Sequence, residues 1–380
     1  MPYKKWSRLK GNAGVQITEN PVCIGVHCPM HTALSVLRGA GGISSLVVGM
    51  PECCCYSRFV VDHTRGAERH YTYILEDSEV VFGCSKGVED ALRTMAKEGC
   101  AHVLVIRTCI PSLIGEDLEQ AAKTVTADTG TKIQMIDAAH YKRNGWMSGV
   151  TMTLSALGDF APALKKQKLV YQLGEAEGAQ WQALCQILRS AGYQVQPLLP
   201  FEAAKWTELG ASCCNLVCLS LMEPLAERLY QRFGTESVRL FAAVDEASAD
   251  SCYEEMERIL KIALPRIRCQ AERPAADKAV STVSTPDAQS LALILSGLGI
   301  QLTGLHMEEA IPWPGEKAGD PEVFFCPDSA QHGETALCLS GSKVPGREIE
   351  QAMKYIGCER IDALATLIRN AQGGNQNAAL

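Results

Sequence analysis

Several motifs that would assign a chemistry are missing from this chain of 380 residues. No G-x-x-x-x-G-K-[ST] segment occurs, so the chain carries no phosphate loop for ATP. Gly39, Gly41 and Gly42 precede a predicted strand instead of following one, which indicates a helix end and not a dinucleotide fingerprint. The absence of an H-E-x-x-H segment argues against a zinc-protease helix.

Long apolar runs are missing as well. No stretch reaches the roughly 18 residues that a membrane span needs. The first residues, MPYKKWSRLKGNAG, lack the apolar core and cleavage site of a signal peptide. The net charge is −7 and the pI is about 5.7, which makes nucleic acid and anionic membranes poor partners. We therefore expect a cytoplasmic protein that binds neither.

Cysteine, in contrast, is abundant, with 17 residues against only 8 histidines. An odd number of cysteines in a chain without an export signal argues against a disulfide framework. No C-x-x-C knuckle of the kind that holds structural zinc occurs. Buried free cysteines behave as small hydrophobic residues, and we assign this structural role to five of them. These are Cys100, Cys185, Cys252, Cys269 and Cys358.

Short apolar runs alternate with amphipathic segments along the chain, which predicts parallel sheets covered by helices. The predicted strands are 43–49, 102–107, 132–136, 169–173, 215–220, 238–242, 280–284 and 300–304. The predicted helices are 30–37, 88–97, 118–125, 180–191, 224–233, 253–263 and 288–298. This order is typical of an α/β fold with doubly wound, Rossmann-like sheets.

Two breaks divide the predicted elements into three domains. The charged segment Lys165–Lys168 separates an α/β domain at 1–166 from a second at 167–273. The Pro/Ala-rich segment Arg273–Lys278 precedes a third, shortened α/β domain at 274–380. Within it, the Gly/Pro/Lys-rich segments Pro312–Pro321 and Ser340–Gly346 are predicted loops, and the tail GGNQNAAL is predicted to fray.

Three cysteine positions of the first domain share one context, because each lies at a loop or a strand end. Cys28 precedes the first helix, Cys53 follows the strand at 43–49, and Cys109 follows the strand at 102–107. The carboxyl ends of parallel strands meet at one edge of a sheet, where ligands bind. Thiolates gathered there are the ligands that an iron–sulfur cluster requires.

Other cysteines remain alternatives. Cys53, Cys54 and Cys55 are adjacent and cannot all point the same way in an extended segment, so any of the three could be the ligand. Cys84 could add a sulfur near the cluster, although a small buried residue is the simpler interpretation. Cys218 could line a cleft between domains, although its apolar strand favours the core.

Three segments of the chain resemble the cysteine motifs of the nitrogenase component 1 family. They are C-P at 28–29, G-M-P-E-C-x-x-Y at 49–56 and T-C-I-P-S-L-I-G-E-D-L at 108–118. The segment from Glu76 to Gly83 resembles the acidic-then-VFGG strand of the family, with Cys84 in place of its second glycine. The family includes nitrogenase, cofactor-assembly scaffolds, protochlorophyllide reductase subunits and a nickel-tetrapyrrole cyclase.

The resemblance implies a specific function. Cys28, Cys53 and Cys109 would ligate a [4Fe–4S] cluster, or half of a larger eight-iron cluster, at a dimer interface. A separate ATP-hydrolysing iron protein would dock there and deliver electrons. The partner chain would be a second copy or a sister subunit, in a dimer or heterotetramer. A substrate, a second metallocofactor or a tetrapyrrole would lie in the cleft between the domains.

Some features of the family find no clear counterpart. His306 and His332 are only candidates for the histidine that binds the large cofactor in nitrogenase, and Cys218 lies about one position from the cofactor cysteine. Catalytic residues are therefore not assigned. Three functions compete: an iron–sulfur reductase, a non-catalytic scaffold for metallocluster or tetrapyrrole assembly, and a binding module whose cysteines are structural.

Overall fold

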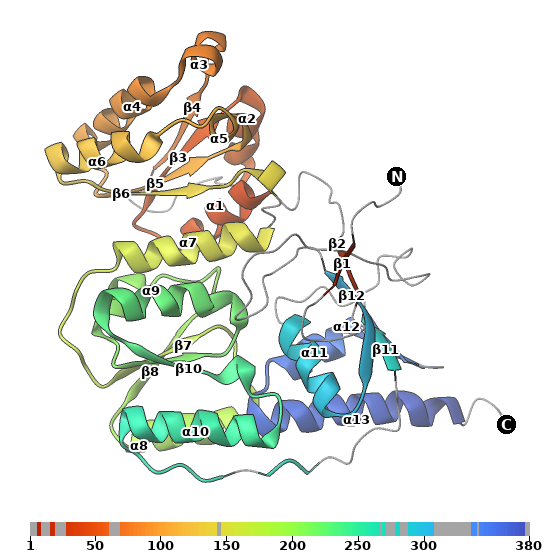
Figure 1. The fold of residues 1–380 in the computed structure, drawn as a ribbon. Helices are drawn as coiled ribbons and strands as arrows, with labels where there is room; N and C mark the ends of the chain where they lie inside the picture. The colour runs from red at the N-terminus through yellow and green to blue at the C-terminus, as the bar shows by residue number, and fades with distance from the viewer. Residues whose placement is uncertain are drawn as a thin grey trace.

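The structure is a computed structural model, and its described residues form three β-sheets. It describes residues 6–8, 16–19, 28–60, 69–142, 146–266, 268–270, 278–281, 288–307, 336–339 and 342–376. Two of the sheets are parallel and belong to α/β units, as the sequence predicts, and the third is mixed (Figure 1).

The first sheet has four parallel strands in the order β4-β3-β5-β6. Its strands are β3 (Ser44–Gly49), β4 (His70–Ile74), β5 (His102–Arg107) and β6 (Lys132–Asp137). Every residue of β3 is buried, which explains its continuous apolar run. Strand β4 was not predicted, because it lies at the edge and its residues are half-exposed.

Helices cover both faces of the first sheet. They are α1 (Pro29–Ala40), α2 (Pro51–Val60), α3 (Asp77–Phe82), α4 (Ser85–Lys97), α5 (Cys109–Leu113), α6 (Leu118–Thr129) and α7 (Trp146–Phe160). The prediction of a strand between Glu76 and Gly83 was wrong. This segment begins with a capping box between Glu76 and Glu79, which satisfies the first amides of helix α3.

The second sheet has four parallel strands in the order β10-β9-β7-β8. Its strands are β7 (Leu169–Leu173), β8 (Gln194–Leu198), β9 (Cys214–Val217) and β10 (Glu236–Arg239), and its helices are α8 (Gly178–Ser190), α9 (Glu223–Phe233) and α10 (Glu246–Leu260). Two predicted strands extended too far, because Ser220–Met222 and Leu240–Ala242 are 3₁₀ turns.

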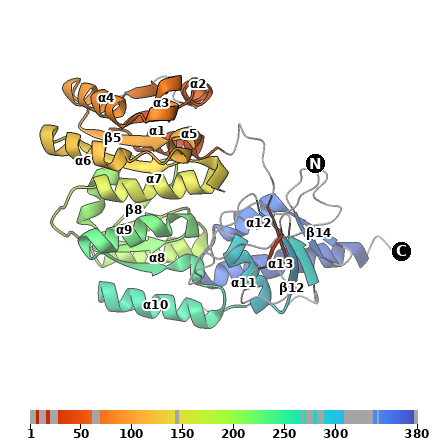
Figure 2. The same ribbon diagram turned by 45° about the horizontal axis from the view of Figure 1, so that its top comes forward.

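The two parallel sheets share a middle layer of helices. In Figure 1, α4 and α6 lie beyond the first sheet, α1, α7 and α9 lie between the sheets, and α8 and α10 lie beyond the second. Figure 2 again shows α7 between the two units. One buried core runs through the middle layer and includes Leu34 of α1, Leu154 of α7 and Leu225 of α9. A Cβ on Gly39 would lie 1.9 Å from the Phe201 carbonyl oxygen, so a glycine is required where α1 meets the second unit.

The third sheet is mixed and not doubly wound, which corrects the predicted architecture. Its strands are β1 (Trp6–Arg8), β2 (Gln16–Glu19), β11 (Lys278–Ser281), β12 (Gln301–Met307), β13 (Ala336–Leu339) and β14 (Ser342–Pro345), and its helices are α11 (Ala288–Gly297), α12 (Gly346–Met353) and α13 (Gly357–Gln376). Strands β13 and β14 pair antiparallel, so the loop predicted at Ser340–Gly346 contains a strand.

The N-terminal strand β2 pairs with β12, so the third sheet combines residues from both ends of the chain. The division at 1–166, 167–273 and 274–380 stays a prediction. Helix α13 reaches Gln376, so the first part of the predicted frayed tail is helical. The loop predicted at Pro312–Pro321 lies outside the described residues.

Candidate functional site

The three predicted ligand cysteines start three helices at one edge of the first sheet. Cys28 is the N-cap of α1, Cys53 lies in the first turn of α2 directly after β3, and Cys109 is the first residue of α5 directly after β5. Strands β3 and β5 are neighbours, but the chain leaves them toward opposite sides, to β4 and to β6. This is the switch point at which doubly wound sheets bind ligands.

The charges of neighbouring candidate cysteines affect the pKa of Cys28 and that of Cys53. Burial raises the pKa of Cys28; the amides of Met30 and His31 lower it, and the charges of Cys53 and Cys109 raise it further. The Cys28 side chain makes no capping hydrogen bond, so these amides act as nearby dipoles. Cys53 and Cys109, which come from two other segments, are thus near enough to Cys28 for their charges to act on it.

Cys53 has a similar environment. Burial raises the pKa of its thiol, and the charges of Cys109 and Glu52 add to this effect. The Thr108 hydroxyl, which donates to the Val48 carbonyl oxygen at 2.8 Å, also lies against Cys53 and lowers the pKa of that thiol. Three thiolates at this edge would repel one another unless a cation were bound between them.

Helix α2 separates the three adjacent cysteines, which corrects the expectation of an extended segment. Cys54 is 1% exposed and turns toward the sheet, where its sulfur lies 3.6 Å from the Tyr73 carbonyl oxygen and 3.7 Å from that of Gly49. Burial, together with Cys53, raises the pKa of Cys54 to about 11. Cys55 is exposed. Of the three, Cys53 is the one whose charge acts on Cys28 and on which the charge of Cys109 acts.

The remaining candidates lie elsewhere. Cys84 is the buried N-cap of α4, in the core on the other face of the sheet, and burial raises its pKa to about 11 with Glu116 and Glu79 contributing. Cys218 is buried after β9 of the second sheet. His306 lies in β12 of the third sheet, and His332 lies outside the described residues.

Close packing by α7 holds the start of α1, where Cys28 lies. A Cβ on Gly149 of α7 would lie 2.2 Å from the Pro29 carbonyl oxygen and 2.3 Å from the Thr32 hydroxyl. The Thr32 hydroxyl donates to the Trp146 carbonyl oxygen at 2.7 Å. Only a glycine lets the two helices approach this closely, so Gly149 fixes the position of the Cys28 loop.

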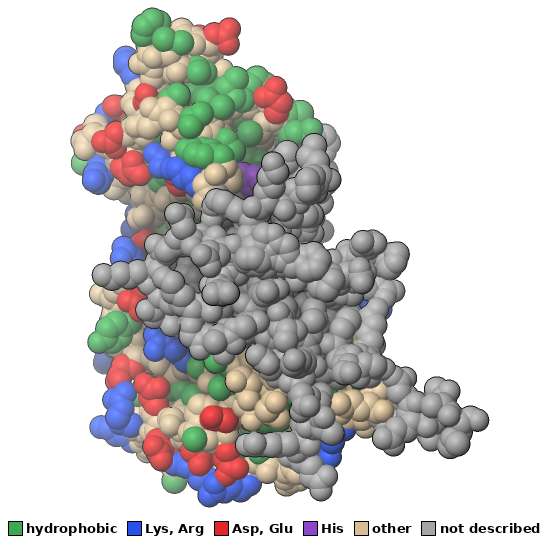
Figure 3. All heavy atoms as spheres, turned by 45° about the vertical axis from the view of Figure 1, so that its right-hand side comes forward, with side chains coloured by type: hydrophobic (Ala, Val, Ile, Leu, Met, Phe, Trp, Pro, Cys, Tyr) green, Lys and Arg blue, Asp and Glu red, His purple; other side chains and the backbone are tan. Residues whose placement is uncertain are grey.

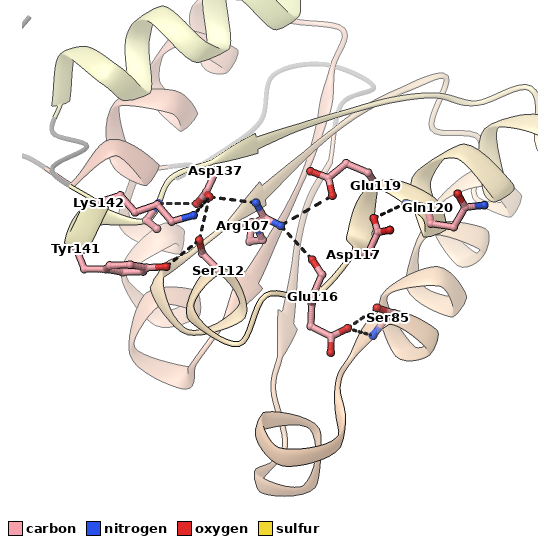
Figure 4. A network of polar contacts seen from close by, with 11 residues as sticks. Ser85, Arg107, Ser112, Glu116, Asp117, Glu119, Gln120, Asp137, Tyr141 and Lys142 are labelled. Carbon is pink, nitrogen blue, oxygen red and sulfur yellow. Dashed lines mark hydrogen bonds and ion pairs between the residues drawn. The ribbon is translucent and has the colours of Figure 1, made fainter. Parts of the chain in front are cut away.

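A polar network holds the helix that carries Cys109 (Figure 4). Asp137, at the end of β6, accepts hydrogen bonds from the Ser112 hydroxyl at 2.9 Å, from Arg107 at 3.1 Å and from Lys142 Nζ at 2.6 Å. Burial alone would raise the pKa of Asp137, but the bonds from Lys142 and Ser112 and the charge of Arg107 lower it. The ionised carboxylate therefore ties α5 to the end of the neighbouring strand.

The far end of the same loop is tied by Glu116. Arg107 donates to the Glu116 carbonyl oxygen at 3.1 Å, and the Glu116 carboxylate accepts from the Ser85 amide at 3.1 Å at the start of α4 (Figure 4). Both ends of the segment that carries Cys109 are therefore fixed to the sheet and to α4.

A neutral histidine ties α2 to the sheet. His70 of β4 makes hydrogen bonds of 2.8 Å to Ser45 of β3 and 2.9 Å to Ser57 of α2. The Ser57 hydroxyl donates to the Cys54 carbonyl oxygen at 2.8 Å, so it accepts from His70, and Nε2 carries the ring proton. Burial, with the nearby charge of Arg58, lowers the pKa of His70 to about 4.

These supporting residues were not identified in the sequence. Asp137 directly follows the predicted strand at 132–136, so the rule that located Cys53 and Cys109 could have found it too. Nothing in the sequence marks His70 or Gly149, because their roles depend on contacts between segments that lie far apart along the chain.

Comparison with known proteins places the chain in a family. The family described as "Nitrogenase component 1 type Oxidoreductase" matches residues 28–299, a range that begins at Cys28 and includes Cys53 and Cys109. The chain belongs to this family. No curated protein matches it.

Two solved structures show how the fold compares with that of nitrogenase. One described as "Nitrogenase Cp1 at pH 6.5" has a TM-score of 0.51 at 14% identity, covering 82% of this chain and 74% of the other. A second, "Nitrogenase Cp1 at pH 5", has a TM-score of 0.47 at 15% identity, covering 83% and 68%. The first likeness shows that this component 1 type chain shares the nitrogenase fold.

The site of this component 1 type protein fits an iron–sulfur cluster by the chemistry of its donors. Its three thiols are half-buried, and soft sulfur ligands select iron–sulfur clusters, zinc or copper(I). Within the part of the chain that the structure describes, no three His, Cys, Asp or Glu side chains converge on one metal ion.

The helices that carry the cysteines also present apolar side chains to solvent. Tyr56 of α2 is 58% exposed and Leu113 of α5 is 65% exposed. On the short helix α3, Val81 is 72% and Phe82 is 87% exposed. Figure 3 shows hydrophobic side chains gathered over the first sheet and its helices, at the top of that view. No helix among the described residues is long and apolar enough to span a membrane.

Proposed function

We propose that this chain is an oxidoreductase subunit of the nitrogenase component 1 type that holds an iron–sulfur cluster on Cys28, Cys53 and Cys109. The observation that carries the proposal is the position of the three cysteines at the starts of α1, α2 and α5, beside the switch point of the first sheet, where the charges of Cys53 and Cys109 act on Cys28. A thiolate trio in a half-buried site requires a positive group, which an iron–sulfur cluster supplies.

When bound, the cluster would accept and pass on one electron at a time at low potential. The residues of this chain would hold the cluster and set its reduction potential. The Thr108 hydroxyl, which donates to the Val48 carbonyl oxygen, lies against Cys53. The Met30 and His31 amides near Cys28 would donate toward its ligating sulfur. Hydrogen bonds to cluster sulfurs raise the reduction potential, so these groups would make reduction easier.

The donor set implies a partner chain. A [4Fe–4S] cluster takes four ligands, and the site supplies three cysteines. The exposed Tyr56 and Leu113 lie on the two helices that carry Cys53 and Cys109. We propose that a second copy or a sister subunit covers this face and completes the cluster, which could have four or eight irons.

As the component 1 family implies, electrons would come from a separate iron protein that hydrolyses ATP, in keeping with a sequence that has no phosphate loop. The substrate, a second metallocofactor or a tetrapyrrole would lie between the α/β units. The many free thiols fit a reducing compartment, and we propose the cytoplasm.

Anaerobic purification with iron and sulfide analysis and EPR tests the cluster. We expect a brown protein with iron and sulfide in equal amounts, and loss of both in Cys109→Ala and Cys28→Ala. Cys185→Ala, which changes a buried thiol of α8 in another core, is the matched control and should keep its iron. A colourless protein that contains zinc, or iron retained in both ligand variants, would overturn the proposal.

Turnover separates a reductase from an assembly scaffold for metalloclusters or tetrapyrroles. A reductase should reoxidise its cluster when supplied with a cognate iron protein, ATP and a reducible substrate. A scaffold should bind the metallocluster or tetrapyrrole stably and transfer it without repeated oxidation and reduction. The EPR signal of the reduced cluster during the reaction distinguishes the two outcomes.

A further inference from the structure

A second group of thiols lies far from the candidate cluster site, between the second unit and the C-terminal helices. The Cys269 and Cys358 sulfur atoms are 2.7 Å apart. This distance is shorter than the contact between two unbonded sulfur atoms and about 0.7 Å longer than a disulfide bond. Cys358, the second residue of α13, is 1% exposed, whereas Cys269 is half-buried.

The segment that carries Cys269 is held against its surroundings independently of the sulfur contact. The Gln270 amide donates to both carboxylate oxygens of Asp362 on α13, each at 3.0 Å. On the other side, Arg268 forms an ion pair with Glu246 of α10. These contacts keep the two sulfurs facing each other, so little rearrangement is needed to join them.

The start of α13 is also docked on α8 of the second unit. The Glu359 carboxylate accepts from the Ala179 amide at 2.9 Å and from the Gln180 amide at 2.7 Å. In return, the Gln180 side-chain oxygen accepts from the Glu359 amide at 3.0 Å. The thiol pair therefore lies at the interface between the unit of the second sheet and the helices that pack on the third sheet.

We propose that Cys269 and Cys358 form a reversible disulfide that holds this interface together. The disulfide forms when the protein reacts with a small-molecule disulfide such as oxidised glutathione. Cys269, the more accessible thiol, loses its proton and attacks the reagent, which forms a mixed disulfide and releases one thiol. Cys358 then attacks the Cys269 sulfur, which forms the Cys269–Cys358 bond and releases a second thiol. Two cysteine sulfurs are oxidised by two electrons in total, and the reagent disulfide is reduced to two thiols.

The burial of the pair fits a bond that forms only under oxidising conditions. Burial raises the pKa of both thiols, so both are protonated at neutral pH and exchange slowly. Once formed, the bond would join residue 269 to α13 and enclose the chain that carries β11, α11, β12, β13, β14 and α12. It would therefore restrict separation of the C-terminal helices from α8 and α10.

Peptide mapping of the full-length protein tests this directly. The protein is treated with oxidised glutathione, its remaining thiols are blocked, and it is digested without reductant. We expect one linked pair of peptides that contain Cys269 and Cys358, with the loss of two hydrogen atoms. Amide hydrogen exchange at the start of α13 should slow by about 30-fold. Both effects should disappear after reduction and in Cys358→Ser.

Cys252→Ser is the matched control, because Cys252 is a half-buried thiol of nearby α10 that contacts the Arg239 carbonyl oxygen and neither sulfur of the pair. This variant should form the linked peptide normally. Recovery of Cys269 and Cys358 as blocked free thiols, or a stable glutathione adduct on Cys269, would overturn the proposal. Because the wild-type digest decides the question, the result does not depend on the folding of a variant or on the cluster.

Discussion

The hydrogen bonds of His70 make the stability of the first unit sensitive to acid. His70 bridges Ser45 of β3 and Ser57 of α2, the helix that carries Cys53. Its pKa is lowered to about 4 by burial and by the charge of Arg58, from an ordinary value of 6.5. The folded state thus holds the ring neutral, and the unfolded state binds more protons below pH 6.5. Stability is complete above that pH and falls as the pH drops toward 4.

The size of the effect follows from the two pKa values. Each unit of difference corresponds to about 1.4 kcal/mol. Between pH 7.5 and 5, a shift from 6.5 to about 4 would lower the free energy of unfolding by about 2 kcal/mol. Because His70 is only partly buried, solvent screening reduces this, and we expect a loss of about 1 to 1.5 kcal/mol.

The variant His70→Gln isolates this contribution. The glutamine amide can donate to Ser57 and accept from Ser45, but it does not titrate. Urea unfolding of both proteins at pH 7.5 and pH 5 should show that the wild type loses about 1 to 1.5 kcal/mol more than the variant. The His70 ring should titrate near pH 4 by NMR. Equal losses in the two proteins, or a ring pKa near 6.5, would refute this interpretation of the His70 site.

Two further substitutions test how the cysteine loops are held. In Gly149→Ala, the new Cβ meets the Pro29 carbonyl oxygen, and we expect about 1 to 3 kcal/mol of destabilisation and lower iron content, measured by unfolding and metal analysis. In Ser112→Ala, loss of the bond to Asp137 should cost about 1 kcal/mol and shift the EPR signal without removing iron. A Gly149→Ala protein of wild-type stability, or an unchanged Ser112→Ala spectrum, would contradict these roles.

The strands with continuous apolar runs could be predicted from sequence because burial on both faces leaves a clear pattern. The predicted strands at 102–107 and 169–173 match β5 and β7 in full. Strand β4 could not be found in this way, since one edge strand with half-exposed residues resembles a loop. The third sheet was misjudged because β2 pairs with β12, and nothing local to either segment indicates that pairing.

The candidate site, like the fold, could be predicted from the sequence only in part. The rule that strands of a parallel sheet end at one edge was enough to point to Cys109 and to the run of cysteines at 53–55. It could not choose among the three adjacent cysteines, because that choice depends on α2 being a helix. Pro51 at its first position and Glu52 in its first turn are typical helix-start residues, and they were the available signal. The contacts of Asp137, Gly149 and His70 required the folded structure.

The central claim is that Cys53, and not its buried neighbour Cys54, belongs to a thiolate trio that holds an iron–sulfur cluster. The most direct measurement is the iron and sulfide content per chain of anaerobically purified Cys53→Ala and Cys54→Ala, with circular dichroism to establish that both are folded. We predict that Cys53→Ala loses its cluster and that Cys54→Ala keeps the wild-type amount. A cluster that survives in Cys53→Ala but is lost in folded Cys54→Ala would contradict the assignment.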